Sequence, residues 1–239
     1  MRARKLGAVA RRAAIAPVVL IACASVALGA ARHVTRADAT AVADSLSLRH
    51  GDVPGFTQVG VQGPPSALER RLSAGFAACY GGPPYSSVLA DRQSPGFQAS
   101  DASRTLVITD TEIFPSAAVA ARDLAAAAGK RGQGCALTFG RAAVTPPKGT
   151  RITATLTSIA SHDRGTGASI AVRLTLTEVP TSKGGPASRV VATQDELSFV
   201  RGQAEISFDL GTSSAAPPSA ALERRLASLL VARARSVLG

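Results

Sequence analysis

The sequence predicts an α+β domain in which an antiparallel sheet is packed by about three helices and held by one disulfide. First, residues 151–210 alternate between apolar and polar positions, which indicates four consecutive strands forming a meander. Second, residues 66–79, 116–128 and 219–238 carry apolar residues at helical spacing. Third, Cys79 and Cys135 are the two cysteines outside an apolar N-terminal segment, so we expect them to pair in an exported chain.

Residues 1–39 predict a signal peptide or an N-terminal membrane anchor. Met1 to Arg12 is positively charged, and Ala13 to Ala31 is uncharged and mostly apolar, about long enough to form a transmembrane helix. Three outcomes stay open: cleavage after Ala39, lipid attachment at Cys23 as in a bacterial lipoprotein, or retention as an anchor. Each predicts export, with residues 40–239 forming a single extracytoplasmic domain at the cell membrane, or a secreted one if the leader is cleaved.

The N-terminal half of this domain contains short strands and two helices. After a connector at 32–44, we expect a strand over 57–61, and then a helix that starts at a Ser66–Glu69 capping box. Leu68, Leu72, Phe76 and Cys79 form the expected core stripe of that helix. Further strands are predicted at 97–100 and 105–114, a helix follows Ser116, glycines interrupt 129–134, and a short helix spans 136–144.

The C-terminal half contains the meander and a closing helix. Leu222, Leu226 and Leu229 give the closing helix an apolar face for the sheet. We expect this face and the stripe of the 66–79 helix to cover the same side of the sheet. The other side carries the threonines of 153–157 and Arg173.

The net charge and the absence of known sequence motifs argue against nucleic-acid binding and against a catalytic, metal or cofactor site. Residues 1–39 hold seven of the 27 basic and one of the 16 acidic residues, so the remainder carries a net charge of only +5. With dispersed charge and few aromatic residues, no nucleic-acid binding is expected. His33, His50 and His162 are scattered, and neither zinc spacing nor a nucleotide-binding motif is present, so no catalytic residues, metal site or cofactor are predicted.

One acidic set merits a structural test. Asp110, Glu112 and Asp195 could share a sheet face and hold a cation, although pairing with Arg173, Arg189 or Arg201 is the simpler interpretation.

The order of features resembles a known family. It runs from a turn at Asp52-Val53-Pro54-Gly55-Phe56, through a Cys-terminated helix and Ser94-Pro95-Gly96-Phe97, to Phe199-Val200-Arg201-Gly202 and a closing helix. This order is similar to actinobacterial exported domains like the extracellular sensor domain of PknH-type receptor kinases and related lipoproteins. The resemblance covers about 45–238 and implies a ligand cleft beside the sheet. The resemblance implies two disulfides, whereas this sequence has the cysteines for one, and we expect no kinase domain in these 239 residues.

These observations predict a noncatalytic, sensor-like envelope protein, with a hydrolase of unrecognised site as the alternative. Expected partners are the membrane, through the N-terminal apolar segment, and a small ligand, lipid, glycan or envelope protein. Tyr85 and Arg173 are candidate cleft residues.

Overall fold

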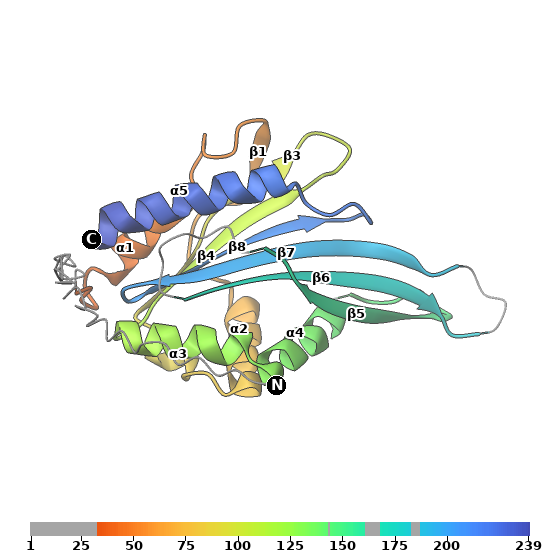
Figure 1. The fold of residues 1–239 in the computed structure, drawn as a ribbon, viewed down its shortest axis with the longest axis horizontal. Helices are drawn as coiled ribbons and strands as arrows, with labels where there is room; N and C mark the ends of the chain where they lie inside the picture. The colour runs from red at the N-terminus through yellow and green to blue at the C-terminus, as the bar shows by residue number, and fades with distance from the viewer. Residues whose placement is uncertain (1–32, 143, 161–167, 183–186) are drawn as a thin grey trace, which may run out of the picture.

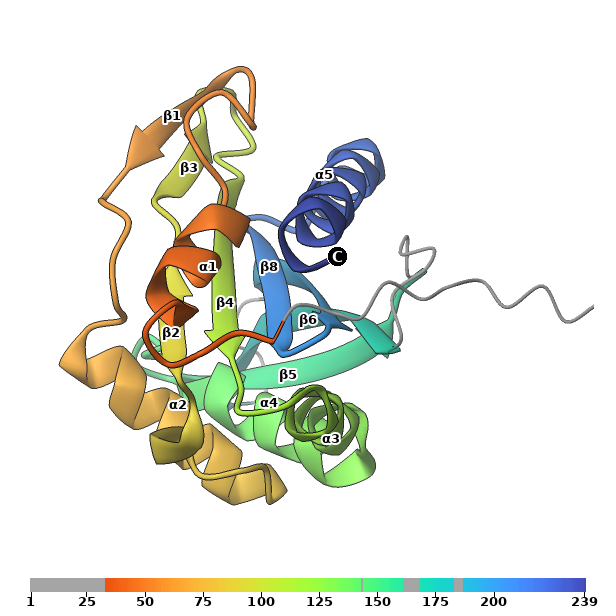
Figure 2. The ribbon, with the colours of Figure 1, turned by 90° about the vertical axis from the view of Figure 1, so that its left-hand side faces the viewer.

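The computed structural model describes residues 33–142, 144–160, 168–182 and 187–239. Within them, an eight-stranded antiparallel sheet lies between two helical layers (Figures 1 and 2). The sheet order is β1-β3-β4-β8-β7-β6-β5, and β2 pairs with β4 beside β3. A disulfide joins Cys79 to Cys135, so the predicted fold class is confirmed.

The helices and strands have the following bounds: α1 (Ala39–Leu46), β1 (Phe56–Val59), α2 (Ala67–Tyr80), a 3-10 turn (Tyr85–Ser87), β2 (Ala90–Gln93), β3 (Gly96–Ala99), β4 (Leu106–Ile113), α3 (Ala117–Ala128), α4 (Lys130–Ala142), β5 (Thr150–Ser158), β6 (Ala168–Pro180), β7 (Arg189–Arg201), β8 (Ala204–Thr212) and α5 (Ala220–Leu238). Strands β5 to β8 form the predicted meander, and β8 then pairs with β4 to join it to the N-terminal strands.

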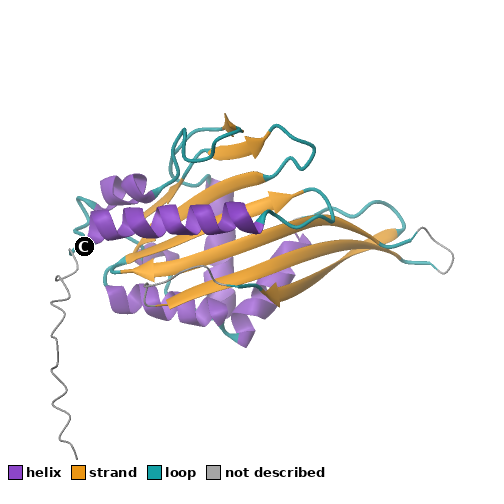
Figure 3. Cartoon of the chain, turned by 45° about the horizontal axis from the view of Figure 1, so that its top comes forward, coloured by secondary structure: helices purple, strands orange, loops and turns teal. Residues whose placement is uncertain are grey.

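Helices α1 and α5 cover one face of the sheet (Figures 1 and 3). Ile206 and Phe208 of β8 point to this side and are buried together with Leu226 and Leu230 of α5. The Ser219 hydroxyl accepts a hydrogen bond from the Leu222 amide and caps α5, which fixes where the helix begins. The largest apolar cluster therefore lies between α5, α1 and the sheet.

Helices α2, α3 and α4 cover the opposite face (Figure 2). Ala120 and Leu124 of α3 pack against Phe114 and Val200, whereas α2 contacts mainly α4 and is linked to it by the disulfide. The expectation that α2 and α5 share one face is wrong. Leu72 is 49% exposed because α2 packs against helices rather than on the sheet, and the Leu68 side chain lies outside the described residues.

Three further elements differ from the sequence prediction. The expected connector contains α1, where Val42, Ala43 and Leu46 are buried at helical spacing. Strand β2 was not predicted. The glycine-rich stretch before Cys135 forms the first turns of α4, in which Gly132 allows close approach to α3: a Cβ there would lie 1.9 Å from the Ala127 carbonyl oxygen.

The predicted transmembrane helix is not supported and is corrected here. Among the described helices none is long and apolar enough to cross a membrane. The longest, α5, carries Glu223, Arg224, Arg225, Arg233 and Arg235 within its 19 residues, and such charges oppose membrane insertion. The segment 13–31, on which the anchor and the membrane partner were predicted, lies outside the described residues, as does Cys23.

Candidate functional site: an acidic cleft

A cleft of about 150 Å³ is lined by the sheet and by helices α2 and α3. These helices lie on the face of the sheet opposite α5 (Figure 2). Its floor comes from β4, β8, β7 and β6, and its walls come from α2, α3 and the loop that carries Pro83 and Tyr85. Five carboxylic acids line it, from three strands and one helix: Asp110, Glu112, Asp123, Glu196 and Glu205. A cleft of this volume accommodates a group about the size of benzene.

The strand register places these acids side by side. Glu112 of β4 lies directly opposite Glu205 of β8, and Glu196 of β7 lies directly opposite Asp209 of β8. Asp91 of β2 lies opposite Glu112 on its other side. Like charges directly opposite each other destabilise a sheet, so three such pairs on one face are costly when ionised.

Burial and mutual repulsion raise the pKa values of the cleft acids. Desolvation is the main cause for Asp110, Glu112 and Glu205, whose pKa values are raised well above their ordinary values, and neighbouring carboxylates add to the effect. Glu196 is exposed within the cleft, yet the protein around it and the Asp209 charge raise its pKa to about 7. The cleft acids therefore keep their protons to a higher pH than exposed carboxylic acids do.

Two tyrosines border the acids. The Tyr80 hydroxyl donates a hydrogen bond to Asp123 Oδ1 at 2.6 Å, and the Tyr85 hydroxyl donates one to Asp91 Oδ2 at 2.5 Å. Desolvation, with the adjoining carboxylate, raises the pKa of each phenol. Both tyrosines are therefore neutral hydrogen-bond donors at physiological pH.

No basic side chain in the described part of the chain forms an ion pair with a carboxylate that lines the cleft. The nearby guanidinium groups of Arg122 and Arg131 donate instead to the backbone carbonyls of Ala118 and Cys79. Asp91 Oδ1, Asp110 Oδ1 and Glu205 Oε2 are buried and receive no hydrogen bond within the described residues, although Asp91 and Asp110 lie close enough to share a proton. Buried polar atoms are normally paired, so Glu205 Oε2 in particular marks where a bound donor fits.

No protein-family model matches this sequence, and no curated protein matches it. Among solved structures, the chain is similar in fold to the extracellular domain of PknH from Mycobacterium tuberculosis. The TM-score is 0.45 at 10% sequence identity, over 86% of this chain and 97% of that chain.

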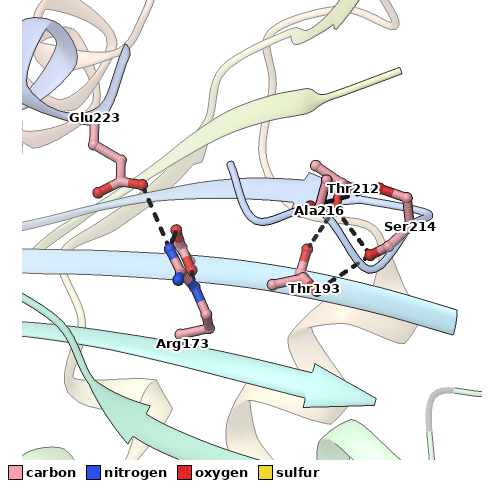
Figure 4. A network of polar contacts seen from close by, with 7 residues as sticks. Arg173, Thr193, Thr212, Ser214, Ala216 and Glu223 are labelled. Atoms are coloured by element: carbon pink, nitrogen blue, oxygen red, sulfur yellow. Dashed lines mark hydrogen bonds and ion pairs between the residues drawn. The ribbon is translucent and has the colours of Figure 1, made fainter. Parts of the chain in front are cut away.

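The acids singled out in the sequence divide between the two faces. Asp110 and Glu112 lie in the cleft, whereas Asp195 lies on the α5 side, fully buried. Arg173 donates to both Asp195 oxygens at 2.6 Å and lies 3.9 Å from Glu223 of α5 (Figure 4). Arg173 therefore does not line the cleft, and the cross-strand pairing considered for Asp195 is present.

The other candidates have these positions. Tyr85 lines the cleft, and Cys79 of α2 forms the disulfide with Cys135 of α4. His33 and His50 do not line the cleft, and His162 lies outside the described residues. Within the described ranges, no group of three or more His, Cys, Asp or Glu residues could hold a metal ion.

Sequence reasoning missed Glu196, Glu205 and Asp123. The alternation pattern of the strands could have identified Glu196 and Glu205, because each is next to a core residue of its own strand, Leu197 and Ile206. This parity places both glutamates on the face away from the main core. Asp123 carried no such signal, since it lies in an alanine-rich helix.

Proposed function

We propose that this protein is a noncatalytic, sensor-like binding protein whose acidic cleft holds a positively charged small ligand. The observation that carries the proposal is that five carboxylic acids line one cavity without a basic partner among the described residues. Repulsion between these acids is relieved by a bound cation, which also favours their ionised forms. Perturbed pKa values in a cleft are typical of functional sites.

The serine side chains that line the cleft are also consistent with a binding role rather than a catalytic one. Ser73, Ser198 and Ser207 line it, and a serine nucleophile needs an adjacent base that is itself oriented by a third group. Neither described histidine lies in the cleft to supply that base, and Ser198 contacts the carboxylate of Glu196 only through a long hydrogen bond of 3.4 Å.

The Cys79–Cys135 disulfide supports a location outside the cytoplasm. Disulfides persist in oxidising compartments and are rare in reducing ones. We therefore propose that the domain meets its ligand in an extracytoplasmic space.

Thermal shift measurements on the purified protein test the proposal. At fixed ionic strength, chloride salts of small amines and of Ca²⁺ are compared with sodium salts of small carboxylates. We expect stabilisation by at least one cation, reaching about 2.7 kcal/mol at a ligand concentration 100 times Kd. No stabilisation by any cation, or an equal effect from the anions, would contradict the proposal.

Two matched variants connect this stabilisation to the cleft. Glu205→Gln removes a cleft carboxylate, and Asp101→Asn removes a fully exposed one in the β3–β4 loop. We expect Glu205→Gln to reduce the stabilisation by the cation and Asp101→Asn to leave it unchanged.

The alternative function is a hydrolase, and one observation favours it. Directly opposed carboxylic acids such as Glu112 and Glu205, with raised pKa values, are also suited to general acid catalysis. A screen of glycoside and ester substrates checks this alternative. Turnover that is lost in Glu205→Gln and kept in Asp101→Asn would favour the enzyme.

A further inference from the structure

The acidic cleft adjoins a second cavity with a different lining. This cavity, of about 40 Å³, shares Phe76, Ala127, Ile170 and Glu196 with the acidic cleft. It continues toward β5, between α4 and the sheet, where Leu156, Val172 and Ala136 line it. The two cavities therefore adjoin, with Glu196 in the lining of both, and together they are called the channel.

The lining changes from charged to apolar along this channel. Beyond Glu196 the one polar side chain that lines the second cavity is Gln133, and its amide already donates to the Ala128 carbonyl at 3.0 Å. The rest of that lining is alanine, leucine, isoleucine, valine and phenylalanine. A ligand that occupies both cavities must be charged at one end and apolar at the other.

We propose that the ligand is a small amphipathic organic cation, with an ammonium group among Asp110, Glu112 and Glu205 and an apolar group beyond Glu196. This inference rests on the proposed function and deepens it. An ammonium group has three donors, and among the described residues that line the cleft Asp110 Oδ1 and Glu205 Oε2 are buried oxygens that receive no hydrogen bond, although Asp110 can share a proton with Asp91. The aromatic rings of Phe76 and Tyr80, with centroids 4.9 Å apart in an edge-to-face pair, flank the cleft and suit a cation near an apolar chain.

Two other cations fit this channel less well. A divalent metal ion needs several ligands converging on one point, and no such group of acids is present in the described ranges. A polyamine would place a second ammonium group in the apolar cavity, where Glu196 is the one carboxylate.

Calorimetric titration of the purified protein with n-alkylammonium chlorides tests the inference. The series runs from ethylamine to octylamine at pH 8 and fixed ionic strength, with alkanols and alkanoates of equal length as controls. Burial of each methylene is expected to tighten binding about fourfold until the second cavity is filled, after which affinity levels off. The alkanols and alkanoates are expected not to bind.

Variants at the second cavity identify where the chain lies. Ala136→Leu fills the cavity, so the affinity is expected to become independent of alkyl chain length while ethylamine still binds. Ala125→Leu, at an exposed position of α3, is the matched control. If Ala136→Leu does not fold, Leu156→Ala serves instead. This variant enlarges the cavity, so the affinity for amines is expected to keep rising to longer alkyl chains before it levels off.

The possible outcomes separate the inference from the proposed function. Equal binding of all amines, or binding of Ca²⁺ or spermidine in preference to hexylamine, overturns the inference and leaves a cation-binding cleft. Chain-length dependence that persists in Ala136→Leu and does not respond to Leu156→Ala also overturns it. The absence of binding by every cation overturns both.

Discussion

Glu196 combines an exposed position in the cleft with a pKa raised to about 7 by desolvation and by Asp209. The acids and phenols that face this part of the cleft are Asp209 and Glu205 on β8, Asp123 on α3 and Tyr80 on α2. None of these groups supplies positive charge, and the 3.4 Å hydrogen bond that Ser198 donates to Glu196 Oε1 lowers the pKa by less than burial and Asp209 raise it. This explains why a glutamate that meets solvent is still half protonated near neutral pH.

We predict that the unliganded protein loses stability between pH 5 and pH 8. An acid with a raised pKa binds more protons in the folded state than in the unfolded chain, so its stabilising effect is complete below its ordinary pKa and is lost as pH rises through the folded value. For Glu196 this window runs from 4.5 to about 7. Urea unfolding at both pH values should show that Glu196→Gln reduces the loss by about 1 kcal/mol, after allowance for screening of this exposed group. An equal loss in the variant would contradict this assignment.

On the α5 side of the sheet, Arg173 stabilises the folded protein by pairing with a buried carboxylate. Asp195 has no exposed surface and receives two hydrogen bonds from Arg173, so removing the guanidinium leaves a buried charge without its partner. Arg173→Met should lower the free energy of unfolding by about 3–5 kcal/mol, and Arg173→Met combined with Asp195→Leu should recover part of it.

A matched control for that variant is available on the same sheet. Arg189 pairs with Glu178 but is 70% exposed, so Arg189→Met should cost about 1 kcal/mol or less. Chemical denaturation of the three variants checks these values. A cost for Arg173→Met similar to that of Arg189→Met would show that the buried pair is not needed for stability.

The disulfide joins α2 to α4, and α2 carries Phe76, Tyr80 and one wall of the cleft. Closing a loop of 56 residues stabilises the fold by roughly 4 kcal/mol in the chain-entropy model. Cys79→Ser with Cys135→Ser should therefore lower the stability by about that amount and weaken cation binding. Because α2 makes few contacts with the sheet, we expect hydrogen exchange to increase in α2 more than in α5. If α2 is equally protected from hydrogen exchange in the unaltered protein and in the double cysteine variant, the disulfide does not hold α2 in place.

The segment before α1 is part of the main core, although the sequence reads as a connector and a cleavage site. Val34 and Ala39 have no exposed surface, and the Gln203 amide bonds both the Val34 amide and the Val34 carbonyl. A chain that starts at Thr40 should therefore be about 2 kcal/mol less stable than one that starts at His33. Parallel denaturation of both chains measures the difference, and equal stability would show that the segment is dispensable.

The meander and the closing helix were predictable because their signals are local. Alternation over 151–210 gives both the strands and their order, and consecutive antiparallel strands usually pair. Helix α1 was missed because it has only eight residues and directly follows the charged residues Arg36 and Asp38. Which face each helix covers was not predictable, because that choice depends on contacts between segments far apart in the chain.

The cleft was predictable only in part for the same reason. Asp110 and Glu112 are two residues apart in one strand, so the sequence alone predicts that their side chains point to the same face of the sheet. The pairing of Glu112 with Glu205 depends on the β4–β8 register, which joins residues 93 positions apart. No local pattern in the sequence carries that register.

The two faces of the sheet now have distinct roles. The α5 side holds most of the buried apolar residues, and its buried Asp195 is paired with Arg173. The α2–α4 side holds the carboxylic acids without basic partners in the described structure. Ionised acids of this kind lower the stability of the protein, and the proposed cation would reverse that effect, so ligand, protons and stability would be linked through one cleft.

This linkage predicts that cation binding releases protons. Glu196 is partly protonated near pH 7, and the pKa values of Asp110, Glu112 and Glu205 are also raised. A bound ammonium group stabilises the ionised forms of these acids and so lowers their pKa values. Hexylamine, which remains charged over this range, should bind more tightly at pH 8 than at pH 6, with about one proton released per ligand at pH 7. Calorimetry in phosphate and in MOPS measures the release, because the two buffers differ in ionisation enthalpy. Glu205→Gln should release fewer protons and Asp101→Asn the same number as the unaltered protein. A binding heat that does not depend on the buffer, or an affinity that falls as pH rises, would show that the ligand does not contact the protonated acids.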